Sequence, residues 1–145
     1  MFLGKFSRTL DSESRFSLPS GFREQLAGRA YLTQGFDRNL QILTSGAFEQ
    51  VYQTVMNLNI ANPLARLLLR LILGTAHETS VDENGHIVIP TELRQFADLQ
   101  KDIFLIGQGE YFEIWSPDLW NQQETQLRDA EANSSRFSAL TVTAH

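Results

Sequence analysis

An alternation of apolar and polar positions occurs twice in the chain, at residues 10–19 and again 71 positions later at 81–90. In each copy an apolar residue and an Asp precede a short polar turn, and an alternating apolar run then ends in Pro. An amphipathic segment with an Arg at the same position follows each copy. An internal repeat of this length indicates that one supersecondary unit is used twice.

Both copies predict the same elements. Period-two alternation predicts strands before and after each turn, the first of them over residues 2–10. Pro19 and Pro90 stand where a strand ends and a short helix can begin, because proline is tolerated in the first turn of a helix. We expect these helices to turn Arg23 and Arg94 outwards. A buried strand and a second hairpin arm complete each copy: 31–32 with 40–43, and 103–106 with 111–115.

The turns of the two copies differ in one residue. Asn84-Gly85 in the second copy favours a type I′ hairpin turn, because both residues tolerate positive φ. The first copy has Ser14 where the second has Gly85. A positive φ at a serine would cost about 1 kcal/mol. The first turn is therefore expected to be either strained or differently shaped.

Two helices are predicted between the copies, because apolar residues recur there at helical spacing. The first begins near residues 45–46. The second has Asn62 as its N-cap and Pro63 at its first position, and Gly74 is expected as its C-cap. Its inward stripe should consist of Leu64, Leu67, Leu68, Leu71 and Ile72.

The second helix is also apolar outside this stripe, at Leu69 and Leu73. A helix that is apolar over more than half of its circumference needs cover on two sides. We expect the second side to be an oligomer contact between subunits. Arg66 and Arg70, four positions apart, are expected at the edge of this contact or in a salt bridge across it.

The repeat divides the chain into four parts and predicts a mixed α+β fold. Residues 1–53 form the first unit, and residues 54–76 form a helical connection with the subunit contact. Residues 77–126 form the second unit, which ends in a helix over about 117–132. Residues 127–145 are expected to be a C-terminal tail that is partly disordered.

Composition limits the class of protein. A chain of 145 residues can bury a core, and the absence of cysteine excludes a disulfide scaffold and a cysteine zinc site. The N-terminus lacks the regions of a signal peptide, and the most apolar segment, 64–73, is too short to span a membrane. These features predict a cytoplasmic protein without a membrane partner.

The charge is unevenly distributed. The formal net charge is −5, which argues against non-specific binding to nucleic acid. Residues 1–38 nevertheless hold six basic and four acidic side chains, whereas residues 98–145 hold three and eight. A local basic face matters more for recognition than the sum over the chain. The N-terminal part can therefore face an anionic partner.

Catalytic and metal-binding patterns are incomplete. His77-Glu78 begins like the zinc-protease motif H-E-x-x-H, but the second His is missing. Gly107 and Gly109 begin like a dinucleotide fingerprint, but Phe112 stands where the third glycine is needed. We expect no enzyme activity, no cofactor and no metal.

Several motifs together, in their order and spacing, resemble the MraZ family of division and cell-wall cluster regulators. The resemblance runs from Met1 to about Gln126. It is carried by the D-x-x-x-R motif of residues 11–15 and by four further segments: Met1-Phe2-Leu3-Gly4, Asn62-Pro63-Leu64-Ala65-Arg66, Leu71-Ile72-Leu73-Gly74-Thr75-Ala76 and Phe112-Glu113-Ile114-Trp115.

This resemblance implies a fold and a function. The fold is two tandem AbrB-like swapped-hairpin β units in a pseudo-twofold arrangement, with intervening helices. The function is that of a sequence-specific DNA-binding transcriptional repressor of its own division and cell-wall operon. Such a repressor acts as a ring-shaped homo-oligomer, and its D-x-x-x-R loops read direct repeats in double-stranded DNA upstream of its own gene. It would be associated with the nucleoid.

The loops also make physical sense as DNA readers. An Arg at the tip of a rigid hairpin presents a planar fork that can bind guanine or grip phosphate, and Arg15 has that place here. Asp11 and Asp82 are expected to hold the turns by accepting backbone N–H bonds, with Gly85 supplying positive φ. For each basic residue the alternative is a solvated surface side chain. The candidate DNA contacts are Arg15, Arg8, Lys5, His86 and Asn84.

A different class of function stays open beside the repressor. An oligomeric protein-interaction scaffold with little DNA binding is favoured by Ser14, by His86 in the place of an Arg, and by the acidic C-terminal half. Salt-sensitive binding to a defined DNA distinguishes the two, because phosphate contacts release counterions.

The substitution of His86 for an Arg predicts a pH dependence. A histidine with the reference pKa of about 6.5 is mostly neutral at neutral pH and attracts phosphate weakly. We therefore expect the first loop to dominate binding and the affinity for DNA to rise as the pH falls from 8 towards 6 at fixed salt. A titration of binding against pH checks this, and a flat profile would contradict it. The alternative is a His that packs on its turn.

Overall fold

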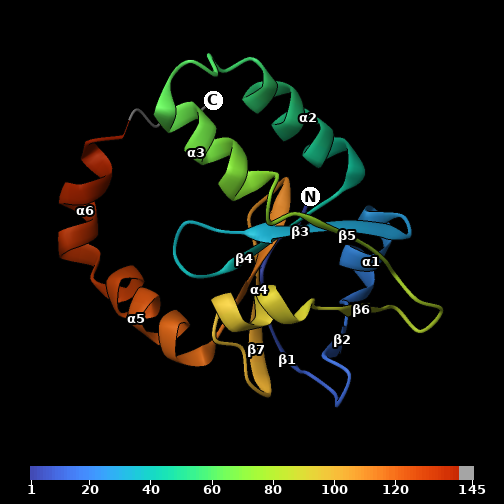
Figure 1. The fold of residues 1–145 in the computed structure, drawn as a ribbon. Coiled ribbons are helices and arrows are strands. Elements are labelled where there is room, and N and C mark those ends of the chain that lie inside the picture. The colour runs from blue at the N-terminus through green and yellow to red at the C-terminus, as the bar shows by residue number, and fades with distance from the viewer. Residues whose placement is uncertain (141–145) are drawn as a thin grey trace.

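Six strands form one antiparallel sheet and two more form a separate ribbon in the computed structural model, which describes residues 1–140 (Figure 1). The sheet has the order β1-β7-β8-β4-β3-β5, and the ribbon pairs β2 with β6. Their bounds are β1 Lys5–Thr9, β2 Arg15–Ser17, β3 Arg29–Gln34, β4 Leu40–Leu43, β5 His77–Ser80, β6 His86–Val88, β7 Asp102–Gly107 and β8 Tyr111–Trp115.

The two copies exchange strands. The first strand of the first copy, β1, pairs with β7 of the second copy, with Phe6 opposite Leu105. The corresponding strand of the second copy, β5, pairs with β3 of the first, with His77 opposite Leu32. The central pair β4–β8 joins the halves of the sheet about the pseudo-twofold axis. The predicted mixed α+β fold of two swapped-hairpin units is confirmed.

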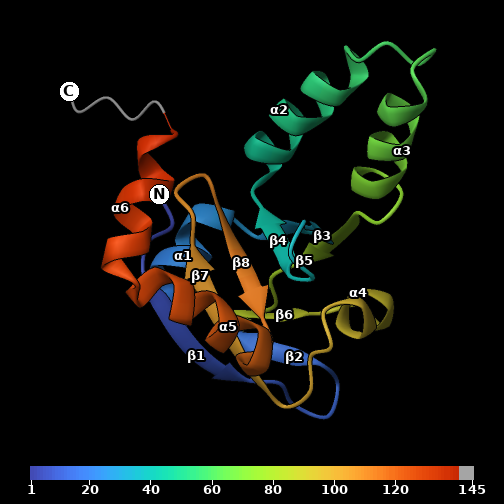
Figure 2. The ribbon, with the colours of Figure 1, turned by 90° about the vertical axis from the view of Figure 1, so that its left-hand side faces the viewer.

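The helices flank the sheet and the ribbon. As predicted, Asn62 caps α3 by accepting the backbone N–H of Leu64, and Pro63 is the first residue of that helix. Helices α2 and α3 form a hairpin that projects from the sheet, as Figure 2 shows. The bounds are α1 Ser20–Leu26, α2 Ser45–Met56, α3 Pro63–Ile72, α4 Thr91–Phe96, α5 Pro117–Arg128 and α6 Ala130–Ser138. Among residues 1–140, no helix is long and apolar enough to cross a membrane.

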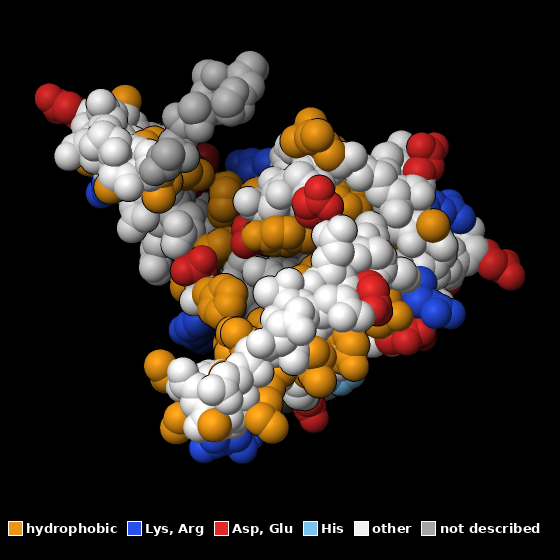
Figure 3. Space-filling model, turned by 90° about the horizontal axis from the view of Figure 1, so that it is seen from above, with side chains coloured by type: hydrophobic (Ala, Val, Ile, Leu, Met, Phe, Trp, Pro, Cys, Tyr) orange, Lys and Arg blue, Asp and Glu red, His pale blue; other side chains and the backbone are white. Residues whose placement is uncertain are grey.

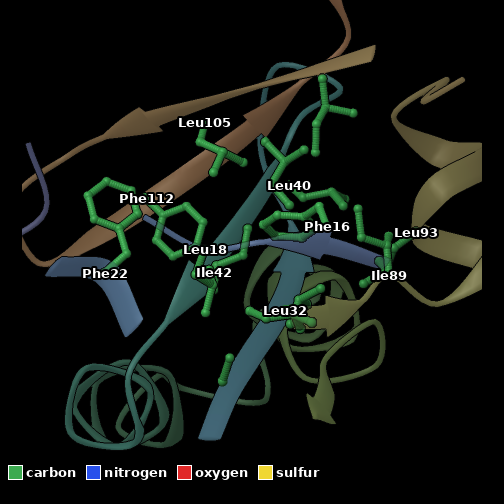
Figure 4. Close-up of a cluster of buried hydrophobic side chains, with 14 of the residues drawn as sticks. Phe16, Leu18, Phe22, Leu32, Leu40, Ile42, Ile89, Leu93, Leu105 and Phe112 are labelled. Carbon is green, nitrogen blue, oxygen red and sulfur yellow. The ribbon is translucent and has the colours of Figure 1, made fainter. Parts of the chain in front are cut away.

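One hydrophobic core serves both copies (Figure 4). Phe22 of α1 lies 5.0 Å from Phe2 and 4.8 Å from Phe112 of β8, measured between ring centroids. Phe16 of β2 and Ile87 of β6 are buried in the same cluster. Full burial of a side chain of this size contributes about 1.5–3 kcal/mol. The ribbon is therefore fixed to the sheet by the inner side chains of both its strands.

The boundaries differ from expectation at both ends of the chain. Strand β1 begins at Lys5, because Gly4 with φ +91° turns the chain before it. Phe2 makes only an isolated bridge, to Gly109. The last predicted helix ends at Arg128, and α6 follows over residues where a partly disordered tail was expected. The part of that tail at 141–145 lies outside the described residues.

The faces of α3 also differ from expectation. Leu64 and Leu67, predicted to face inwards, are 72% and 62% exposed, whereas Leu69 and Leu73 are half-buried. The reason is tertiary: α3 packs on α2 and β3 only in part, and its N-terminal half lies at the end of the hairpin that projects away from the sheet (Figure 2). Gly74 follows the C-cap residue Leu73 and has no positive φ.

Candidate nucleic-acid interface

The two repeated loops have the same backbone geometry. In the first, Asp11 N–H donates to Arg15 O and Ser14 N–H donates to Asp11 O, each over 3.0 Å. In the second, the equivalent bonds join Asp82 to His86 and Gly85 to Asp82, also over 3.0 Å. The last loop residue is left-handed in both, with φ 60° at Ser14 and 77° at Gly85.

The predicted type I′ turn is wrong. Positive φ occurs at Gly85 and not at Asn84, so the loop is a three-residue connection that ends in a left-handed residue. The Asn-Gly preference is overridden because the carboxylate of Asp82 accepts the N–H groups of Asn84 and His86, over 2.9 and 2.8 Å. These bonds require the wider loop.

The aspartates hold both loops by this means. Asp11 Oδ1 accepts the N–H groups of Glu13 and Arg15, each over 2.9 Å. The backbone N–H of Arg15 lowers the pKa of Asp11 below 3.8, and the backbone N–H of His86 does the same for the pKa of Asp82. Because both pKa values are lowered in the folded state, the ionised carboxylates stabilise the loops above about pH 4 and lose this effect as the pH falls through the folded pKa.

Arg15 is oriented but accessible. Its Nε lies 2.9 Å from Asp11 Oδ2, its Nη1 lies 3.5 Å from Glu13 Oε2, and its side chain is 40% exposed. Ion pairs at such exposed positions contribute little to stability, because solvent screens them. The guanidinium can therefore exchange these carboxylates for an incoming anion without losing the loop, which the backbone bonds maintain.

The ribbon brings four side chains to one outer face. Arg15 of β2 lies opposite Val88 of β6, and Ser17 lies opposite His86. Since alternate residues of a strand point to opposite sides, these four face away from the core, into which Phe16 and Ile87 point. Val88 is 44% exposed. Sequence reasoning missed Ser17 and Val88, although the alternation that places them was visible.

Two helix arginines support the loops from behind. Arg94 of α4 donates from Nη1 to Ser14 Oγ over 2.6 Å. Arg23 of α1 donates from Nη2 to the backbone oxygen of Glu83 over 2.8 Å. The prediction that both arginines point outwards is wrong for Arg94, which is half-buried, whereas Arg23 is exposed as predicted and still reaches the opposite loop. Only the pairing between the copies reveals these contacts, because the partners lie 80 and 60 positions apart.

The other candidate residues are dispersed. Arg8 Nε donates to Ser17 O over 2.9 Å, which places Arg8 beside the ribbon. Lys5 lies on the opposite face of β1, with Nζ 3.9 Å from a carboxylate oxygen of Glu124 on α5. His86 Nδ1 lies 3.6 Å from Asp82 Oδ1, and Asn84 is exposed in its loop. The structure thus brings Arg8, Arg15 and His86 to the ribbon and separates Lys5 from them.

Metal binding and acid–base catalysis find little support in the described part of the chain. Among residues 1–140, no group of three His, Cys, Asp or Glu side chains is placed to hold a metal ion. Within the described residues, burial raises the pKa of the half-buried carboxyl of Glu113. Its carboxylate accepts hydrogen bonds from Trp115 Nε1 and Asn39 Nδ2, over 3.0 and 2.8 Å. It therefore links β8 to the residue before β4, at the centre of the sheet.

Comparison with known proteins agrees with the repeat. The family model described as "MraZ protein, putative antitoxin-like" matches residues 1–71 and again 72–142. A protein of Thermomicrobium roseum named transcriptional regulator MraZ is 36% identical over 92% of this chain and 94% of its own length. Proteins of the same name from Roseiflexus castenholzii and Alkaliphilus metalliredigens are 36% and 37% identical, over 95% and 84% of this chain and 94% and 85% of their own lengths.

Because Ser14 and Gly85 differ at the left-handed position, mutations at the two sites should change the free energy of unfolding differently. A Cβ at Gly85 would lie 3.1 Å from Cδ of Arg23, at φ +77°. Gly85→Ala should therefore lower the free energy of unfolding by about 1–2 kcal/mol. Ser14→Gly relieves the left-handed serine but removes the acceptor of Arg94, so its net effect should stay within about 1 kcal/mol.

Urea unfolding of the two variants beside the wild type measures both effects. A Gly85→Ala variant as stable as the wild type would contradict the proposed role of the glycine.

Proposed function

The chain belongs to the MraZ family, and we propose that it is a sequence-specific DNA-binding regulator that represses its own division and cell-wall operon. The proposal places it in the cytoplasm, at the nucleoid. The observation that carries it is the outer face of the β2–β6 ribbon, where Arg15 and His86 stand on two firmly held loops. The names of its relatives support transcriptional regulation.

The β2–β6 ribbon is of a kind that can read DNA, since it has two antiparallel strands. The major groove of B-DNA, about 12 Å wide, admits a two-stranded β-ribbon, and an Arg in it can bind guanine through two hydrogen bonds. Arg15 already presents its guanidinium at the end of β2. Arg8, beside the ribbon, can contact phosphate, and Val88 can contact the methyl group of a thymine. Lys5 faces α5 and is left out of this surface.

One ribbon alone should bind weakly. Four arginines lie at or behind the loops, and four carboxylates compensate their charge: Arg8, Arg15, Arg23 and Arg94 against Asp11, Glu13, Asp82 and Glu83. A ring of subunits overcomes this weakness, because every contact after the first becomes intramolecular at high effective concentration. We therefore include the cyclic homo-oligomer and the direct repeats upstream of the gene in the proposal.

The helical hairpin offers a surface for the oligomer. Large apolar side chains are exposed along it, and Figure 3, which looks onto this end of the molecule, shows hydrophobic side chains in several exposed groups. Arg66 donates to the backbone oxygen of Ile60 over 2.8 Å, so it braces the loop between the helices, while Arg70 is exposed. The side chains proposed for the contact are Met56, Ile60, Leu64 and Leu67.

One observation favours the alternative function, an oligomeric protein-interaction scaffold. The carboxylates of the loops nearly cancel the arginines, which weakens attraction to any polyanion. An oligomeric scaffold would keep the hairpin contact and lack salt-sensitive binding to DNA.

The main test compares Arg15→Ala with the wild type in binding DNA from upstream of the gene, across a salt series. We expect the wild type to prefer this DNA to a scrambled sequence, with an affinity that falls as salt rises. Arg15→Ala should lose about tenfold or more in affinity, the scale of one Arg–guanine contact in each subunit. Arg128→Ala, which removes the same charge from an exposed site on α5, is the matched control. Equal loss in both variants, or none in either, would contradict the assignment.

If the α2–α3 hairpin forms the oligomer contact, substitutions in it should lower the mass of the oligomer. Replacing Leu64 and Leu67, 72% and 62% exposed, by Ser should shift the protein from oligomer to smaller species, because the apolar contact is lost. Size-exclusion chromatography with light scattering measures this. Leu127→Ser, at a 57% exposed leucine on α5, should keep the oligomer. An unchanged mass in the double variant would exclude the hairpin as the contact.

A further inference from the structure

The loops and the helices behind them are connected crosswise. The loop of the first copy is bound by α4 of the second copy, through Arg94 and Ser14. The loop of the second copy is bound by α1 of the first, through Arg23 and Glu83. Neither arginine bonds the loop of its own copy.

Backbone hydrogen bonds repeat the same crossing. Ile89 N–H donates to Ser14 O, and Leu18 N–H donates to Gly85 O, each over 2.9 Å. The acceptor in each loop is thus the left-handed residue, which is also the residue against which the arginine lies. Each loop is held by a backbone group and an arginine that both come from the other copy.

The two supports use different chemistry, and this explains the sequence difference between the loops. Arg94 bonds a side-chain oxygen, which Ser14 supplies. Arg23 bonds a backbone oxygen and packs within 3.1 Å of the position that a Cβ on residue 85 would take, which favours glycine there. The residue at the left-handed position is therefore matched to the arginine of the opposite helix.

We propose that Arg94 and Arg23 are positioning residues for DNA binding, each of which sets the DNA-contacting loop of the other copy. This inference rests on the proposed function. Arg94 is suited to support and not to contact DNA, because its Nε, Nη1 and Nη2 donate to Leu99 O, Ser14 Oγ and Gln100 O, over 3.0, 2.6 and 3.4 Å. Each loop therefore depends on the opposite half of the chain in addition to its own aspartate, so the two loops are ordered together.

Hydrogen exchange tests the crossing without DNA. In Arg94→Gln, the amides of Ser14 and Arg15 should exchange faster than in the wild type, while those of Gly85 and His86 stay protected. Arg23→Gln should give the opposite pattern. Ser14→Ala serves as the milder variant, since it removes one bond of Arg94 and keeps the two that Arg94 makes to Leu99 and Gln100. Faster exchange in the loop of the mutated copy, or in neither loop, overturns the inference.

A double-mutant cycle tests the effect on DNA binding. Arg94→Gln and Ser14→Ala should each weaken binding to the upstream DNA by about tenfold, the scale of one hydrogen bond to a charged group. The double variant should be no weaker than Arg94→Gln alone, because both changes break the same contact. Ser14→Ala leaves the net charge unchanged, and Ser7→Ala, on the far face of β1, is the control. If the two losses multiply, Arg94 acts on DNA by itself and the inference is wrong.

The two proposals fail in different ways. A wild type that ignores the upstream DNA refutes the proposed function, and the exchange experiment still decides whether the loops are crosswise supported. A wild type that binds this DNA, with losses that multiply, keeps the proposed function and overturns the positioning role.

Discussion

The exchange of strands between the two copies is the constraint on which the other features depend. Strand β1 has its partner in the second copy and β5 has its partner in the first, so each half alone leaves strands unpaired. Unpaired backbone groups in a buried sheet are costly. The ribbon follows from the same exchange, since β2 and β6 come from different copies and bury Phe16 and Ile87 in the shared core.

A pseudosymmetric frame with unequal ends suits a direct repeat in the proposed complex. The ribbon carries Arg15 opposite Val88 at one end and His86 opposite Ser17 at the other. A symmetric protein dimer matches a palindromic site, whereas unequal ends give the ribbon a direction on DNA. The copies also differ at the left-handed position, where Ser14 contacts Arg94 and Gly85 lies against Arg23. The two copies share the backbone of the ribbon and its loops, whereas the side chains on the outer face differ between them.

Local patterns predicted most of the elements, and failed where a side chain outside the pattern or a neighbouring element decides. The period of two and the prolines predicted the strands and the short helices, and Asn62 predicted the cap of α3 correctly. The Asn-Gly dipeptide predicted the wrong turn, because Asp82 accepts two N–H bonds in its loop. The stripe of α3 was misjudged, since periodicity shows that a helix has an apolar face but not how far its neighbours extend along it.

The sequence by itself determined that one unit occurs twice, that each copy has an aspartate-held loop, and that Arg15 stands at the first of them. These are local properties, which spacing and residue type express directly. Only the tertiary structure decided that the copies exchange strands, that Lys5 faces α5, and that Arg94 and Arg23 hold the loops of the opposite copy. The physical reason is distance along the chain: contacts that span 60 positions or more depend on how the units pair, and no local pattern records that pairing.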